Sequence, residues 1–407
     1  MGGRRVRDGR YEWLRVGAML CILLCHAVAH LPWRLEDQPG WRGALAVGVD
    51  QYAGQVGVSM FFMLSGFFLA RRPFTFQRPV KVVVQTFCYS AACTLIALFV
   101  YPHMPALMHP DMPWRGRDLA YYLYMGLAPT LNDAYWFITA YVLMILFSPL
   151  ANLAFRRLSS TQILWFMAVA GFLSVMPYVT FSGFAYNGLF WTTPVYALLC
   201  YAAGGWIRLY GAGVRARVSW PLAVGYGLVA FLALSAFIHA AQEQGPLARF
   251  LAWKPRSIYG TIPLLAVVFS AMVLLLVSAP RRAGARPVHG ARGGSPLSGL
   301  GGVLGSTVFG VYLIHQNWLI GNDVWRVAGW LAPEPQGALR KALMLGAVVV
   351  VSFVVLAVCS WCFDRVLVTP VQRLVSRLLA GSAAERFAAG LSDAIGREDA
   401  VPPSRRP

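Results

Sequence analysis

The sequence predicts an all-α fold: a polytopic membrane helix bundle of about ten transmembrane helices, with both termini in the cytoplasm. Composition is the first observation behind this prediction, because 58% of the 407 residues are hydrophobic and only 13% are charged. The mean hydropathy of +0.57 is far above that of a soluble globular protein. Long apolar runs recur from one end of the chain to the other, which is the second observation.

Each predicted span is a mostly apolar stretch of a length that can cross the hydrocarbon core. The ten stretches cover residues 13–31, 45–70, 81–101, 134–155, 162–182, 188–208, 219–240, 258–279, 301–320 and 341–364. A shorter apolar stretch, Leu119 to Leu127, is too short to cross, and we expect it to form an interfacial helix on the outer side.

The distribution of Lys and Arg sets the orientation. With both termini inside, the cytoplasmic segments hold roughly 25 of these residues and leave roughly 10 outside. Shifting the topology by one span would invert this excess. Basic cytoplasmic loops also account for the net charge of +19 without a nucleic-acid partner.

Three segments follow from this topology. Residues 1–12 form a basic cytoplasmic arm, residues 13–365 the membrane domain, and residues 366–407 a cytoplasmic tail. We expect the tail to begin with an amphipathic helix at Thr369–Leu379 and to continue as a disordered stretch rich in Ala, Gly, Ser and Pro. The Gly-, Pro- and Arg-rich stretch from Arg281 to Ser298 is predicted to be a flexible cytoplasmic linker.

Arg15 and His26 lie inside the first apolar segment, eleven residues apart. Eleven steps bring a helix back to within roughly 20° of its starting face, and they separate the two groups by roughly 16 Å along the axis. That distance is about half the thickness of the hydrocarbon core. Ionisable groups are costly at this depth and usually face a protein interior or a watery cavity. The pair therefore predicts part of an active site.

Two arginines directly follow the second span, whose last turns carry four small residues, Gly57, Ser59, Ser65 and Gly66. Small residues let neighbouring helices approach closely. Arg71 and Arg72 fit a positive-inside anchor, and they equally fit a clamp for the phosphates of a nucleotide-bearing donor.

Aromatic and imidazole side chains mark the outer half of two further spans. Tyr135 and Trp136 are typical of an aromatic belt at the membrane boundary, and they also suit stacking on a sugar ring at an acceptor site. His315 is a second intramembrane imidazole, and His30 lies one turn beyond His26. We find no clustered ligand set for a metal in the sequence.

Four sequence blocks together resemble the acyltransferase 3 family, in the same order and over residues 11 to about 365. The blocks are Arg15-x10-His26, residues 57–67 with Arg71 and Arg72 after them, Tyr135-Trp136-Phe137 with Ser148-Pro149-Leu150, and Phe309-Gly-Val-Tyr-Leu-Ile-His315. Members of this family are integral-membrane proteins that O-acylate, usually O-acetylate, surface polysaccharides and other carbohydrates.

The resemblance implies a role for each block. Arg15 and His26 would be the essential pair, and Arg71 and Arg72 would contact acyl-CoA from the cytoplasmic side. Acyl-CoA, by family habit acetyl-CoA, would be the donor substrate with no bound cofactor. A carbohydrate or lipid-linked glycan would be the acceptor, and the lipid bilayer of the cell membrane (plasma or inner membrane) the location. His26 would act as general base or as transient acyl carrier, two roles that remain open.

Two other interpretations remain. The chain could be a transporter or flippase of sugar or acyl groups without catalysis, or an O-acyltransferase of a small-molecule acceptor. A transporter more naturally carries broken helices in paired positions and carboxylates at the midplane. Asp and Glu are nearly absent from the interiors of the predicted spans, with Asp50 and Asp364 towards their ends. The intramembrane His and cytoplasmic Arg residues therefore favour the enzyme.

Overall fold

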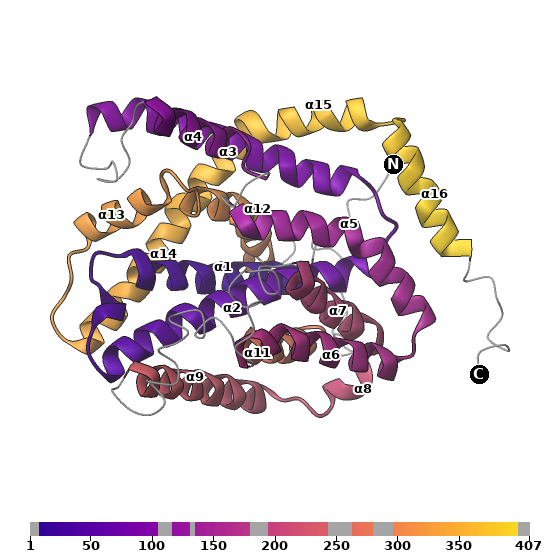
Figure 1. Ribbon diagram of the computed structural model, residues 1–407, viewed down its shortest axis with the longest axis horizontal. Helices are drawn as coiled ribbons and strands as arrows, with labels where there is room; N and C mark the ends of the chain where they lie inside the picture. Colours follow the sequence, from indigo (N-terminus) through magenta and orange to yellow (C-terminus); the bar gives the residue numbers. More distant parts are fainter. Residues whose placement is uncertain are drawn as a thin grey trace. The chain divides into compact units, whose positions relative to one another are not determined.

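The computed structural model describes residues 8–104, 116–130, 135–179, 194–242, 263–279 and 296–397, and all regular structure within these ranges is helical (Figure 1). The chain divides into two compact units. Unit 1 comprises Met1–Leu64, Tyr210–Tyr312 and Asn322–Trp361. Unit 2 comprises Ser65–Leu209, Leu313–Gly321 and Cys362–Pro407. We describe each unit by itself.

The helices of the first half of the chain are α1 (Gly9–His30), α2 (Trp41–Leu69), α3 (Gln77–His103), α4 (Gly116–Leu127), α5 (Trp136–Arg157), α6 (Ser160–Val179) and α7 (Pro194–Tyr210). Those of the second half are α8 (Ala212–Arg215), α9 (Trp220–Gln242), α11 (Pro263–Val277), α12 (Pro296–His315), α13 (Gly321–Leu331), α14 (Ala338–Phe363), α15 (Thr369–Leu379) and α16 (Ala383–Arg397). A short 3-10 turn, Leu35–Asp37, follows α1, and a π-helical turn, Asp364–Val368, joins α14 to α15.

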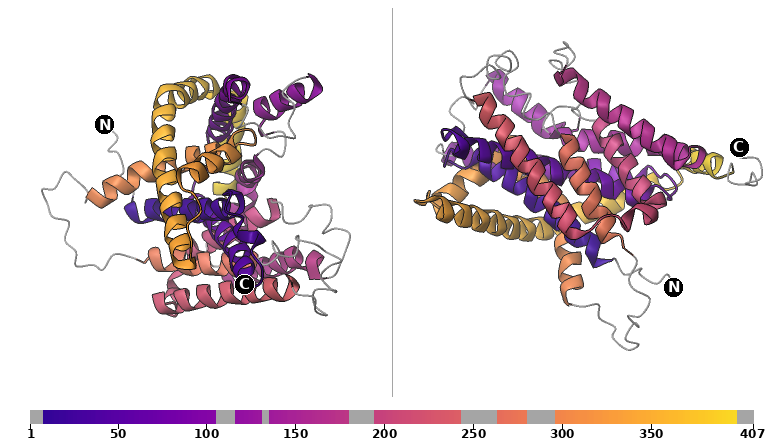
Figure 2. Two further views of the ribbon diagram at one scale, coloured as in Figure 1. Left: turned by 90° about the vertical axis from the view of Figure 1, so that its left-hand side faces the viewer. Right: turned by 90° about the horizontal axis from the view of Figure 1, so that it is seen from below.

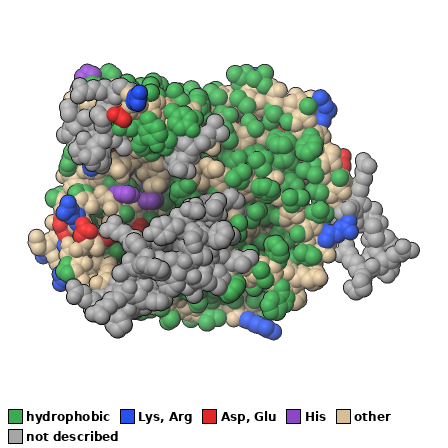
Figure 3. All heavy atoms as spheres, viewed as in Figure 1, with side chains coloured by type: hydrophobic (Ala, Val, Ile, Leu, Met, Phe, Trp, Pro, Cys, Tyr) green, Lys and Arg blue, Asp and Glu red, His purple; other side chains and the backbone are tan. Residues whose placement is uncertain are grey.

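Each of the ten predicted spans coincides with a helix, namely α1, α2, α3, α5, α6, α7, α9, α11, α12 and α14. Within the described residues, seven helices are long and apolar enough to cross a membrane, and α6 and α11 contribute shorter apolar stretches. Hydrophobic side chains cover much of the described surface visible in Figure 3. The prediction of an all-α polytopic bundle is confirmed, while the count of ten spans and the cytoplasmic termini stay predictions.

Two boundaries differ from the prediction. Helix α1 begins at Gly9, so the last residues of the predicted basic arm are helical. The tail was predicted to be disordered beyond its amphipathic helix, which is wrong for Ala383–Arg397, because these residues form α16. Their high alanine content favours a helix, and α16 packs against other parts of unit 2. Most of the predicted linker at 281–298, and the tail beyond 397, lie outside the described residues.

In unit 1, glycines bring α2 and α12 close to α1. A Cβ at Gly54 would lie 2.8 Å from Cys25 Sγ, and one at Gly57 would meet the backbone of Ala18. On the other side of α1, Gly301 faces the Trp13 indole. The close approach expected of the small residues at the end of the second span is therefore confirmed for Gly57.

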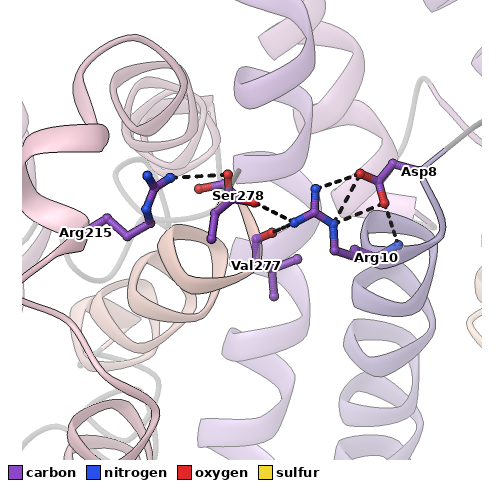
Figure 4. A network of polar contacts seen from close by, with 6 residues as sticks. Asp8, Arg10, Arg215, Val277 and Ser278 are labelled. Carbon is purple, nitrogen blue, oxygen red and sulfur yellow. Dashed lines mark hydrogen bonds and ion pairs between the residues drawn. The ribbon is translucent and has the colours of Figure 1, made fainter. Parts of the chain in front are cut away.

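The N-terminus of α1 is tied to the C-terminus of α11 in unit 1 (Figure 4). Arg10 Nη1 donates hydrogen bonds to the carbonyls of Val277 at 2.9 Å and Ala279 at 2.7 Å, and Arg215 Nη1 donates to Ser278 at 3.4 Å. The last carbonyls of a helix lack intrahelical partners and carry partial negative charge, so two guanidinium groups stabilise this end. Helices α9 and α11 run alongside each other (Figure 2).

In unit 2, α15 lies along α3 (Figure 1), and one carboxylate secures the junction that leads to it. Asp364 Oδ1 accepts hydrogen bonds from Tyr89 at 2.9 Å and from Gln85 at 3.1 Å, both on α3. Further along, Gln372 Nε2 donates to the carbonyl of Lys81 at 2.8 Å. These bonds turn the chain from α14 into the amphipathic helix α15.

Candidate functional site

Arg15 and His26 lie on one uninterrupted helix, α1, as the spacing predicted. Both side chains are half-buried. Because the helix runs without a break from Gly9 to His30, the eleven-residue interval places the two residues on one stripe of its surface. The His26 ring stacks on that of His30, with centroids 5.8 Å apart and an interplanar angle of 15°.

Glu12 is a partner of Arg15 that sequence reasoning missed. Arg15 Nη1 donates a hydrogen bond to Glu12 Oε1 at 2.6 Å, and Glu12 is only 3% exposed. A buried carboxylate is stable only when it is paired and hydrogen-bonded. The spacing of three residues on a helix was the available signal, because such residues are neighbours on its surface. The ion pair fixes the guanidinium at the predicted cytoplasmic end of α1.

Gly305 on α12 makes room for this ion pair. An added Cβ at Gly305 would overlap Glu12 Oε2 and would lie 3.0 Å from Glu12 Cβ. Gly302, on another face of the same helix, has nothing within 4 Å of an added Cβ. The absence of a side chain at position 305 therefore lets α12 cover the carboxylate.

We expect Gly305→Ala to lower the free energy of unfolding by about 1–3 kcal/mol, because the new methyl group overpacks a buried contact. Gly302→Ala is the matched control, and it should be neutral or stabilising by about 0.5–1 kcal/mol, since alanine has the higher helix propensity. Thermal unfolding of the two purified variants in the same detergent measures the difference. Equal unfolding temperatures would contradict the close packing of Gly305 on Glu12.

Asp50 on α2 is a second carboxylate whose role the sequence did not reveal. Cys25 Sγ donates to Asp50 Oδ1 at 2.9 Å, and Gln51 Nε2 donates to Asp50 Oδ2 at 2.6 Å. Asp50 is also within electrostatic range of His30. Since α2 begins at Trp41, Asp50 lies in the third turn of the helix. A carboxylate at this depth marks a functional region by default.

The described residues contain no group of three or more His, Cys, Asp or Glu side chains arranged to hold a metal ion. Two adjoining helices of unit 1 thus carry two stacked imidazoles, His26 and His30, and a carboxyl group, Asp50, which accepts a hydrogen bond from Cys25 and interacts with His30. This set suits proton transfer, in which a positioned imidazole takes or returns a proton.

In unit 2, a buried side chain holds the backbone just before the turn that carries Arg71 and Arg72. Asn152 Nδ2 donates to the carbonyl of Leu69, the last residue of α2, at 3.1 Å, and the Tyr201 hydroxyl donates to Asn152 Oδ1 at 2.9 Å. Both arginine side chains are exposed. A buried network therefore holds the backbone while two cations extend from it.

Two more arginines of unit 2 lie around this turn. Arg78 Nη1 donates to the carbonyl of Pro73 at 2.8 Å, and the Arg208 guanidinium lies 5.2 Å from the centre of the Phe67 ring. Arg72 and Arg78 are close enough for their charges to interact. Both count among the Lys and Arg residues of the predicted cytoplasmic segments, and their proximity to the turn depends on tertiary packing. The cluster can bind an anion with several phosphates.

The structure places Tyr135 and Trp136 in different surroundings. The Tyr135 hydroxyl is buried, donates to the carbonyl of Leu313 at 2.8 Å and accepts from Asn317 Nδ2 at 2.8 Å. It thereby fixes the segment that carries His315, whose side chain is 1% exposed. Trp136 is 38% exposed and lies edge-on to Phe137. Of the two aromatic residues, Trp136 is the one with an exposed surface.

The predicted site residues thus form two groups. Arg15 and His26 belong to unit 1, whereas Arg71, Arg72, Tyr135, Trp136 and His315 belong to unit 2. Glu12 and Asp50 join the first group, and Arg78 and Arg208 join the second.

A model of the acyltransferase domain of the acyltransferase 3 family matches residues 8–364, which is most of the chain and includes both groups of residues. No curated protein and no solved structure matches the chain significantly. The matched region begins at the N-terminal residue of the described structure and ends at the π-helical turn before α15. A helical bundle with membrane-crossing segments, matched over this length, is a membrane acyltransferase, and the chain belongs to the acyltransferase 3 family.

Proposed function

We propose that this protein moves an acyl group, in the first instance acetyl, from cytoplasmic acyl-CoA to a hydroxyl of a cell-envelope or exported carbohydrate. Family membership supports the acyl transfer. The observation that carries the proposed mechanism is the single helix α1, which presents a fixed cation and an imidazole on one stripe. The cell membrane is the proposed location, and a polysaccharide or its lipid-linked precursor the leading acceptor.

The chemistry needs one base and one route for a proton. His26 takes the proton of the acceptor hydroxyl as its oxygen attacks the thioester carbonyl, the C–S bond breaks, and the CoA thiolate leaves and receives the proton from the imidazolium. In the second form of the mechanism, the imidazole attacks the thioester carbonyl first and the CoA thiolate leaves; the acceptor hydroxyl then displaces the imidazole, and its proton goes to the thiolate. Both forms end with an ester and free CoA, and both need the imidazole in its neutral state.

The arginine cluster of unit 2 supports acyl-CoA as the donor. CoA carries several phosphate groups, and guanidinium groups bind phosphate through pairs of charge-assisted hydrogen bonds. Arg71 and Arg72 extend from a turn whose backbone is anchored by Asn152, so they would meet the ligand with little loss of backbone entropy.

The first test is thioester consumption. The purified protein in nanodiscs is supplied with acetyl-CoA, with and without envelope glycan extract, and release of free CoA is followed by coupled enzymatic detection, because a thiol reagent would also label the seven cysteines. Release that requires the protein and increases with the glycan supports the proposal. Substrate flux across the membrane without CoA release would overturn it in favour of a transporter.

We expect Arg71→Ala to raise KM for acetyl-CoA about tenfold or more while kcat changes little, because the loss of one charge-assisted hydrogen bond weakens donor binding. Arg377→Ala is the matched control, since Arg377 is an exposed arginine on α15. Initial rates over a range of acetyl-CoA concentrations give both constants. An unchanged donor KM in the Arg71 variant would remove this residue from the CoA site.

A further inference from the structure

Helix α16 lies beyond the family-matched residues 8–364 and docks on the segment that follows Arg71 and Arg72. Ser392 Oγ accepts a hydrogen bond from the Phe74 amide at 3.1 Å and donates one to the Phe74 carbonyl at 3.3 Å. One hydroxyl thus satisfies both backbone groups of a residue 318 positions away. Such use of a single side chain fixes the local backbone direction rather than only adding contact area.

A second contact is formed three residues further along the same segment. Glu385 Oε1 accepts a hydrogen bond from the amide of Gln77, the first residue of α3, at 3.1 Å. The first amides of a helix have no intrahelical partner and favour a negative charge, so a carboxylate at this position stabilises the start of α3. The Phe387 ring adds an aromatic contact with Phe76, with centroids 6.5 Å apart.

Helix α16 also packs against α5. Arg156 Nη1 donates to the carbonyl of Ile395 at 3.3 Å, and Ala388 is 1% exposed. Helix α16 is therefore fastened along its length, by Glu385 near its start, by Ala388 in its middle and by Ile395 near its end. It is a packed part of unit 2 rather than a loose extension.

The turn with Arg71 and Arg72 consequently has an anchor on each side. Asn152 holds the carbonyl of Leu69 before the turn, and Ser392 holds Phe74 after it. The two exposed guanidinium groups lie between these anchors. Only the second anchor comes from outside the acyltransferase domain.

We propose that α16 is a positioning element for the donor site, with Ser392 and Glu385 as the positioning residues. They hold residues 70–77 in the conformation in which the arginines bind the phosphates of acyl-CoA. This inference rests on the proposed function. Undocking α16 would leave the turn to sample other conformations in the free protein, so donor affinity would fall while the reacting groups on α1 stay in place. The expected signature is a higher donor KM with little change in kcat.

The test uses the full-length protein in nanodiscs and two readouts. Hydrogen–deuterium exchange reports on the peptide that contains the amides of Phe74 and Gln77, with and without CoA. Steady-state kinetics report KM for acetyl-CoA and kcat. The variants are Ser392→Ala, Glu385→Gln and the double variant, and the controls are Asp393→Asn, an exposed acid on the same helix, and Ser376→Ala on α15.

We expect faster exchange of this peptide, weaker protection by CoA and a donor KM raised about five- to tenfold in the double variant, with kcat within about twofold of wild type. The two controls should match wild type. Unchanged exchange would show that α16 does not hold the segment, and faster exchange with unchanged CoA protection would show that docking does not affect the donor. Either result overturns the inference.

The proposed function and the inference about α16 are tested by different measurements, CoA release for the first and CoA protection in hydrogen–deuterium exchange for the second. CoA protection of residues 70–77 is a binding measurement that needs no turnover. If wild-type protein releases no CoA from acetyl-CoA with any glycan, the acyl-transfer proposal is in question, and exchange with CoA still decides the role of α16. If CoA protects none of these residues in wild type, the inference about α16 is overturned, whatever the turnover.

Discussion

Replacing His26 with alanine should reduce thioester consumption about 10²- to 10⁴-fold, which is the range that a positioned general base contributes. The side chain is half-buried, and its ring stacks on that of His30 on the next turn of α1. Because alanine also favours a helix, the unfolding temperature should stay close to that of wild type. The measurement is CoA release from acetyl-CoA at saturating donor.

The matched control is His103→Ala. His103 is an exposed imidazole at the end of α3, where Nδ1 lies 2.7 Å from the carbonyl of Phe99. This variant should retain wild-type turnover. Full activity of a well-folded His26→Ala protein would rule out the mechanism, whether the imidazole acts as base or as acyl carrier.

The same variant separates the two forms of the mechanism. Wild-type protein is incubated with radiolabelled acetyl-CoA in the absence of acceptor, and protein-bound label is measured after rapid denaturation at neutral pH. A transient acyl-imidazole predicts label on wild type that is absent from His26→Ala. Direct transfer with a general base predicts no label that depends on His26.

Arg15→Ala should have the second large effect, because it leaves the buried carboxylate of Glu12 without its counter-charge. An unpaired buried charge costs about 1–3 kcal/mol or more, so the unfolding temperature should fall measurably. We expect turnover to fall as well, because we propose Arg15 as one of the reacting pair on α1. Neither observation alone separates these two roles.

The double variant Glu12→Gln with Arg15→Ala makes the separation. A neutral amide replaces the carboxylate, so most of the lost stability should return, while turnover should stay low. The single variant Glu12→Gln removes the charge and keeps Arg15, and it should be the mildest of the three. Recovery of turnover in the double variant would instead mean that Arg15 serves only to neutralise Glu12.

Which features the sequence could predict depends on their range along the chain. Each of the ten apolar runs predicted the position of a helix, since a helix of this kind depends on residues within one stretch of the chain. The Arg15–His26 stripe depends only on helix geometry, and the unbroken α1 bears it out. Glu12 was within reach of the same reasoning, but a charge near the end of a span resembles an ordinary interfacial residue until its burial is known.

Contacts between residues far apart in the chain could not be predicted from the sequence. The Asn152–Leu69 bond joins residues 83 positions apart, and the Arg78 and Arg208 side chains approach the Arg71–Arg72 turn only through packing. The position of Tyr135 in the sequence fitted both an aromatic belt and a sugar-binding surface. In the structure its hydroxyl donates a hydrogen bond to the carbonyl of Leu313 and accepts one from Asn317. Disorder was expected for Ala383–Arg397 because the tail as a whole is rich in Gly, Ser and Pro, and the distant partners that stabilise α16 are not visible in the local sequence.

The amino-acid sequence by itself thus determined the all-α membrane class, the positions of the apolar helices and the family, because hydrophobic run length and local motifs carry that information. The tertiary structure decided which polar groups are paired, which glycines lie against a neighbouring helix, and what holds the turn with Arg71 and Arg72. Those outcomes depend on side chains from separate helices meeting in space, where burial makes each unpaired polar group costly. Two examples are the burial of the Glu12–Arg15 ion pair by α12 and the hydrogen bond between Ser392 and Phe74.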